Sequence, residues 1–122
     1  MTATASLTEA DLRQFTGSEH WYRHALVPGI LFTDGAKYLA DQAGAYWLLD
    51  EIALAQTLNA RVAAEAFQLW RLTVTPAHTA ILACEDGNGR AVFTKAIAYT
   101  DFPLPEITLY YTGRTILLPS EY

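Results

Sequence analysis

Two histidines four residues apart, His20 and His24, are the first side chains whose type and spacing suit metal binding or catalysis. They lie in the segment HWYRH, on either side of Trp21 and Tyr22. On a helix, side chains at this spacing lie above one another and can share a zinc ion. On a strand they stand about 13 Å apart, at ~3.3 Å per residue, which is too far for one ion with bonds of about 2 Å. We assign the segment to a strand, so we expect no metal there; the histidines and Tyr22 should cover a sheet, with Trp21 packed inward.

The rest of the chain offers no familiar catalytic arrangement. Nucleophilic catalysis needs a Ser, Cys or Thr beside an oriented base. Cys84 is the single cysteine, and it alternates with Ile81 and Ala83 in a predicted strand, where a free cysteine is commonly buried and inert. The sequence contains no G-x-S-x-G, H-E-x-x-H or G-x-G-x-x-G motif. We therefore expect no catalytic residue, no metal and no cofactor, and we favour a protein that is not an enzyme.

Composition and charge narrow the class of protein further. Hydrophobic residues make up 52% of the 122 residues and charged residues 17%, which argues for a packed fold and against disorder. The net charge is −5 and there is no basic run, so binding to nucleic acid is disfavoured. The first residues lack a signal-peptide pattern, and no apolar stretch is long enough for a bilayer. These features predict a cytoplasmic protein without a membrane segment.

The N-terminal half has the patterns of helices and one hairpin. Thr8 and Asp11 suit a capping box, which predicts a short helix over 8–15. The VPG turn predicts a hairpin over 20–33. Helix-forming residues dominate 35–58, with Gly44 in the middle, so we expect two consecutive helices or one kinked helix. The alternative is a hairpin across 30–42, in which the DG pair forms the turn.

From residue 65 the hydrophobic period changes to two, which is typical of strands. DGNG at 86–89 predicts a hairpin turn, the prolines of DFPLPE interrupt the sheet, and GR predicts a last hairpin. The predicted fold class is therefore α+β: helices in the N-terminal half packed on an antiparallel β-meander formed mainly by the C-terminal half. We expect a loose tail over 1–6 and a single domain over 7–122.

The helix predicted over 44–58 carries two apolar stripes. One consists of Ala45, Leu48, Leu49, Ile52 and Ala55. The second consists of Trp47, Leu54 and Leu58. One sheet face can cover only one stripe, so the second must meet the N-terminal helix or another chain. We expect a homodimer through the second stripe.

Several long segments resemble a known family. They are LTEADLRQFTGSEHWYRH, LFTDGAKYLADQAGAYWLLDEIALAQ, CEDGNG, YTDFPLPEITLYY and LLPSEY. Together they resemble a family of small uncharacterised bacterial proteins, a domain of unknown function often found on plasmids, phages and other mobile elements. The resemblance implies no activity, cofactor or catalytic residue. It implies a cytoplasmic bacterial setting and an accessory protein that acts on another macromolecule.

The leading hypothesis is a non-enzymatic protein-interaction module of a bacterial mobile element, an inhibitor or modulator of a host or defence protein. The chain holds fifteen aromatic residues, and excess aromatics suit a partner surface. The alternative is a small enzyme or small-ligand-binding protein with a pocket between helix and sheet, lined by Trp21, Tyr22, His24, Tyr46 and Trp47. The candidate ligand or partner residues are His20, Trp21, Tyr22, His24, Tyr46, Trp47, Tyr110 and Tyr111.

Overall fold

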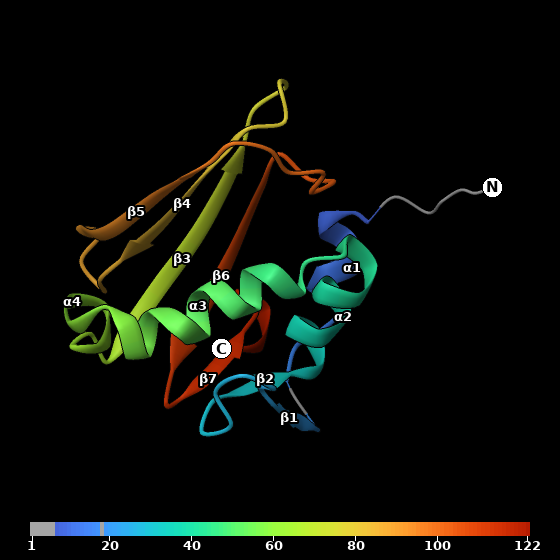
Figure 1. Ribbon diagram of the computed structural model, residues 1–122. Helices are drawn as coiled ribbons and strands as arrows, with labels where there is room; N and C mark the ends of the chain where they lie inside the picture. Colours follow the sequence, from blue (N-terminus) through green and yellow to red (C-terminus); the bar gives the residue numbers. More distant parts are fainter. Residues whose placement is uncertain (1–6, 18) are drawn as a thin grey trace.

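The computed structural model describes residues 7–17 and 19–122, and within them helices pack on one face of a seven-stranded sheet (Figure 1). The expected tail over 1–6 lies outside the described residues. The elements, in chain order, are α1 (Glu9–Arg13), β1 (Trp21–Arg23), β2 (Leu31–Thr33), α2 (Asp34–Ala43), α3 (Tyr46–Leu58), α4 (Ala60–Ala63), β3 (Phe67–Val74), β4 (Ala80–Glu85), β5 (Ala91–Ile97), β6 (Glu106–Thr112), β7 (Thr115–Leu117) and a 3-10 turn, η1 (Pro119–Glu121).

The α+β class is confirmed, but the sheet is not a simple meander. Its strand order is β1-β2-β7-β6-β3-β4-β5. Only β3, β4 and β5 follow one another as a meander, because β6 returns to the other side of β3. The predicted hairpin over 20–33 forms, and it joins the sheet through a parallel pair between β2 and β7. No local turn connects a parallel pair, so sequence patterns could not show this join.

The helices follow their capping residues. The Thr8 hydroxyl accepts the Asp11 N–H at 3.2 Å and the Asp11 carboxylate accepts the Thr8 N–H at 3.0 Å, so the capping box of α1 is confirmed. Thr33 caps α2, and Gly44 ends it in the left-handed conformation with φ of 61°. The 35–58 segment is thus two helices, and the hairpin alternative is wrong because the DG pair forms the first turn of α2. The short helix α4 is capped by Asn59, and it was not predicted from the sequence.

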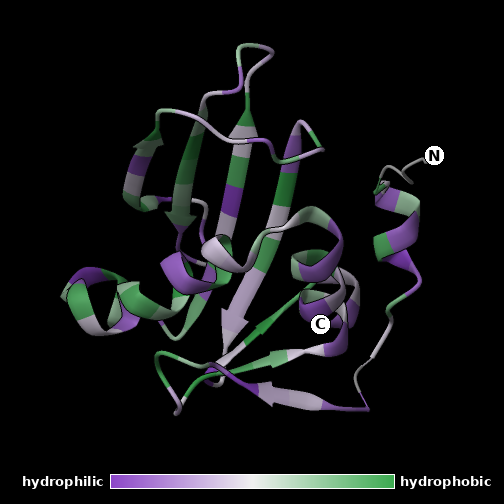
Figure 2. Ribbon diagram, turned by 45° about the vertical axis from the view of Figure 1, so that its right-hand side comes forward, coloured by the Kyte–Doolittle hydropathy of each residue, from purple (hydrophilic) through white to green (hydrophobic). Residues whose placement is uncertain are grey.

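The core lies between the helices and one face of the sheet. The predicted first stripe of α3 is buried, and it packs over the inward residues of the long strands, which α3 crosses (Figure 1). In β6 hydrophobic and hydrophilic residues alternate over residues 106–109, as expected for a sheet with one covered face, whereas β4 is hydrophobic over five of its six residues (Figure 2). The inward residues are Gln68, Trp70, Leu72, Leu82, Cys84, Leu109, Tyr111 and Ile116.

One polar side chain sits inside this core. Gln68 donates to the carbonyl oxygens of Val62 and Glu65 at 2.7 and 3.1 Å, and it exchanges hydrogen bonds with the Gln56 amide. Its Oε1 also accepts the indole N–H of Trp70 at 2.9 Å. A buried polar group is stable only when it is hydrogen-bonded, so Gln68 attaches α3 and the α4 segment to β3.

Candidate interaction surfaces

The His24 side chain connects the β1–β2 loop to α3. It is 3% exposed, and its Nε2 lies 2.9 Å from Asp50 Oδ1 on α3. Its Nδ1 accepts the backbone N–H groups of Leu26 and Val27, both at 3.1 Å. Because Nδ1 is an acceptor, the ring proton sits on Nε2 and is donated to Asp50. Both nitrogens are therefore occupied in closing the β1–β2 loop against α3.

Tyr22 and Tyr46 belong to a polar cluster along α2. The Tyr22 hydroxyl donates to Asp34 Oδ1 at 3.0 Å, and the Lys37 Nζ lies 5.6 Å from the Tyr22 ring centroid. Lys37 also pairs with Asp41 at 2.8 Å, and the Tyr46 hydroxyl donates to the same carboxylate. We call Tyr22, Asp34, Lys37, Asp41 and Tyr46 the α2 polar cluster. His20 lies at its margin, with Nδ1 3.7 Å from Asp34 Oδ2.

The pKa shifts in the α2 polar cluster point away from acid–base catalysis. Hydrogen bonds from Lys37 and then Tyr46 lower the pKa of Asp41. The hydrogen bond to Asp41 raises the pKa of Lys37 and that of Tyr46. At neutral pH these groups are thus fixed as a carboxylate, an ammonium and a neutral phenol. A general acid or base works best with a pKa near the working pH, so the cluster suits positioning or binding.

The remaining predicted aromatic residues are divided between the two faces of the sheet. Trp21 is 54% exposed and does not pack inward as expected. Alternation on β1 turns Tyr22 toward the helices, where it stacks on Phe32, so Trp21 points to the other side. Tyr110 and Tyr111 are likewise separated, because Tyr111 is buried in the core and its neighbour faces outward.

The face of the sheet opposite α3 carries mixed aromatic, aliphatic and charged side chains. Near the C-terminus, the rings of Phe67, Tyr110 and Tyr122 form a trio with centroids 5.0 to 5.4 Å apart. Further along, Arg71 pairs with Glu85 at 2.7 Å and Glu106 at 3.4 Å on the two neighbouring strands. We call this surface the open face; on β3, β4 and β6 it comprises Phe67, Leu69, Arg71, Thr73, Ile81, Ala83, Glu85, Glu106, Thr108, Tyr110 and Thr112.

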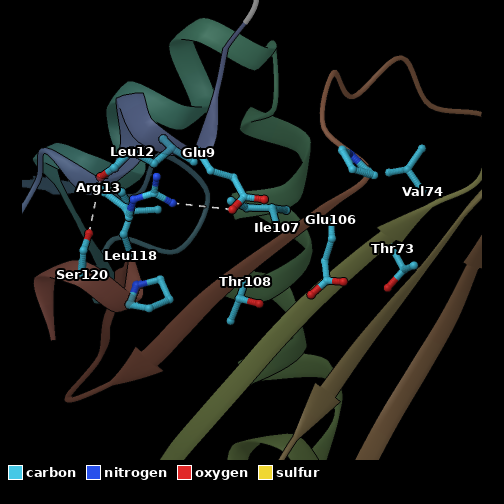
Figure 3. Close-up of a pocket in the computed structure, with 12 residues that line it drawn as sticks. Glu9, Leu12, Arg13, Thr73, Val74, Glu106, Ile107, Thr108, Leu118 and Ser120 are labelled. Atoms are coloured by element: carbon cyan, nitrogen blue, oxygen red, sulfur yellow. Dashed lines mark hydrogen bonds and ion pairs between the residues drawn. The ribbon is translucent and has the colours of Figure 1, made fainter.

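A cavity of about 640 Å³ opens at the end of the open face. Figure 3 shows it between α1, which contributes Glu9 and Arg13, and the strand residues Thr73, Glu106 and Thr108. Arg13 and Glu9 approach to 3.8 Å on its rim. Its lining includes none of the residues expected for a pocket between helix and sheet. The apolar part of the lining is Leu12, Val74, Pro105, Ile107, Leu118 and Pro119.

The second stripe of α3 lies along β5, the last strand of the sheet. Leu54 and Leu58 line a hollow of about 440 Å³ together with Phe93. Trp47 and Ile97 line a second hollow of about 250 Å³. Leu58 remains 79% exposed, so its stripe is only partly covered within the chain.

Residues 7–17 and 19–122 hold no group of three or more His, Cys, Asp or Glu side chains arranged to bind a metal ion. None of the described helices combines the length and apolarity needed to cross a membrane.

A family model described as "Family of unknown function (DUF6876)" matches residues 6–122. The chain belongs to this family. The predicted resemblance to a family without a known function is thereby confirmed. No curated protein and no solved structure matches this DUF6876 chain.

The paired charged residues on the surfaces of this DUF6876 member were not predicted from the sequence. Lys37 and Asp41 stand four apart in a predicted helix, so their pairing was open to prediction. Arg71, Glu85 and Glu106 come together only through strand register, which no local pattern gives.

Proposed function

We propose that this protein is a non-enzymatic interaction module that docks a protein partner on the open face. The observation that carries the proposal is the composition of that face. Aromatic residues and arginine are enriched where proteins bind one another, and the trio of Phe67, Tyr110 and Tyr122 lies beside Arg71. Trp21 and Ile81, which are both exposed, widen the same side of the sheet.

The charges of the open face favour a protein over a phosphate backbone. Arg71 lies between two carboxylates, so its positive charge is already balanced. Binding to nucleic acid needs several free cations on one surface, and the chain has a net charge of −5. A partner that offers apolar and hydrogen-bonding side chains fits this face better than a polyanion.

The cavity at the end of the open face gives the partner a place to anchor. Its apolar walls, including Leu12, Ile107 and Leu118, suit one inserted hydrophobic side chain. Interface energy usually concentrates in such pockets near buried aromatic or aliphatic anchors.

The identity of the partner rests on the resemblance alone. The resemblance implies a setting on plasmids, phages or other mobile elements, and such a setting suggests that the partner is a bacterial host or defence protein, which this chain would inhibit or modulate in the cytoplasm.

Site-specific photo-crosslinking in a bacterial lysate tests the docking face. A benzophenone side chain at Thr108, on the open face, should trap one defined protein. The same group at the exposed Leu26, in the β1–β2 loop, should not. Adding unlabelled protein should compete away the product, whereas unlabelled Ile81→Arg should compete about tenfold less well. Equal trapping from both positions would contradict the assignment.

A second candidate function is small-ligand binding in the same cavity, favoured by its volume of about 640 Å³. A ligand that binds only the folded state raises the unfolding temperature. A thermal-shift screen with small amphipathic molecules tests this, and Thr108→Trp, which projects into the cavity, should abolish any shift. One observation counts against this function. The charged residues of the cavity, Arg13 and Glu106, already pair with Glu9 and Arg71 within the chain, so they are less suited to bind a charged ligand.

A further inference from the structure

The outer edge of β5 is a second surface with the properties of an interface. β5 ends the sheet and, among the described residues, pairs with β4 alone, so one edge of it presents free backbone N–H and C=O groups. Proteins usually blunt such edges with short strands, prolines, charged side chains or bulges. At the opposite end of the sheet β1 has three residues, whereas β5 has seven.

β5 is weakly protected against pairing. It contains no proline, and its single charged residue, Lys95, is drawn over α3 by an ion pair of 2.6 Å with Glu51. A bulge disturbs the register where Ala91 meets Glu85, but Phe93–Ile97 pair regularly with β4. A regular segment of strand is therefore open to another chain.

We propose that the protein forms a homodimer in which β5 pairs antiparallel with β5 of a second copy, about a two-fold axis at Thr94. In this register Thr94 faces Thr94, Phe93 faces Lys95, and Val92 faces Ala96. No like charges stand opposite each other in this register. A register centred on Lys95 would place two ammonium groups face to face, which disfavours it.

The two hollows between α3 and β5 form a groove, and this groove is complementary to the same groove of a second copy under the two-fold axis at Thr94. It has one hollow at its Leu58 end and another at its Trp47 end, and it has protruding side chains too. Leu58 is 79% exposed and Tyr99 is 69% exposed. A two-fold axis at Thr94 brings the Leu58 end of one copy toward the Trp47 end of the other. A projecting leucine thus meets a hollow, as a self-complementary interface requires.

This dimer goes beyond the proposed docking function and does not depend on it. A two-fold axis perpendicular to the sheet joins the two sheets edge to edge and keeps both helical layers on the same side. Both open faces then lie together on the other side. Such a dimer would present two docking faces to one partner assembly and gain avidity from them.

The mass in solution, measured by sedimentation equilibrium, is the first test. The wild-type protein should approach twice the chain mass of 13.5 kDa as its concentration rises. Leu58→Arg, a change at an exposed position, should remain folded by circular dichroism and sediment as a monomer. Ile81→Arg, at an exposed position of the open face, should remain a dimer. A wild-type monomer at every concentration would overturn the proposal.

Crosslinking tests the register. In Thr94→Cys the two new thiols face each other, so a short bis-maleimide should join two chains without denaturant. Ile81→Cys should give no joined chains, and the wild-type protein, with only the buried Cys84, serves as the blank. Joining through Ile81→Cys but not Thr94→Cys, or a dimer broken by Ile81→Arg and kept by Leu58→Arg, would instead place self-association on the open face and refute the β5 pairing.

Discussion

The ring of His24 and the carboxylate of Asp50, 26 residues apart in sequence, meet at 2.9 Å between Nε2 and Oδ1. This contact attaches the β1–β2 loop to α3, while the other ring nitrogen holds two backbone N–H groups of the loop. The histidine with the most suggestive spacing in the sequence thus has a structural role.

His24→Phe should lower the free energy of unfolding by about 2 kcal/mol, because it keeps the volume of the ring but leaves the Leu26 and Val27 N–H groups without an acceptor. Asp50→Asn is the matched control. It keeps an oxygen facing Nε2 at a carboxylate that is 43% exposed, so it should cost under about 1 kcal/mol. Urea unfolding measures both. Equal losses would show that the hydrogen bond between His24 and Asp50, and not the loop hydrogen bonds, carries the stability.

Gln68→Leu should destabilise the fold by about 3 kcal/mol or more, since it removes the partners of the Trp70 indole N–H and of two backbone carbonyls in the core. Gln56→Leu removes only the reciprocal amide pair and one bond to Ile52, so a loss of about 1 kcal/mol is expected. Denaturant unfolding compares the two variants. A Gln68→Leu variant as stable as the wild type would mean that the amide network adds nothing to the free energy of folding.

Asp41→Asn should change how stability depends on acid. The pKa of Asp41 is lower in the folded state than in the unfolded chain, chiefly through Lys37. Its stabilisation is thus complete above the unfolded value of about 3.9 and disappears as the pH falls through the folded value. Thermal unfolding from neutral pH to about pH 2.5 should therefore show a difference between wild type and Asp41→Asn that shrinks at low pH. Tyr46→Phe keeps the ion pair and should show a smaller effect; a difference independent of pH would exclude this linkage.

Cys84 should resist thiol reagents in the native protein. Burial, followed by the negative charges of Glu65, Glu85 and Asp86, raises the pKa of its thiol to about 12. At pH 8 only on the order of 1 in 10,000 thiols is then ionised, and the side chain is also inaccessible. Labelling should be slow in buffer and fast in denaturant, whereas Ile81→Cys should add one fast-reacting thiol in buffer. Rapid native labelling of the wild type would sink the prediction.

The sequence by itself determined the local elements. The Thr8 and Asp11 capping box, the VPG and DGNG turns, and the first stripe of α3 all act between residues near in sequence, so their patterns are readable. Gly44 was expected to interrupt the helical segment. It adopts a left-handed backbone conformation there, which residues with a Cβ atom avoid. The inward burial of Trp70, Leu72 and Cys84 followed from the period of two.

Only the tertiary structure decided how these elements meet. The parallel pair of β2 and β7, the placement of β6 beside β3, and the position of β5 as an edge join segments far apart in the chain, and no turn or period encodes them. These joins create contacts that could not be predicted from the sequence. Examples are the pairs of Arg71 with Glu85 and Glu106, and the pair of His24 with Asp50. Long-range pairing depends on the total free energy of packing many segments at once, whereas capping and periodicity depend on neighbours a few residues away.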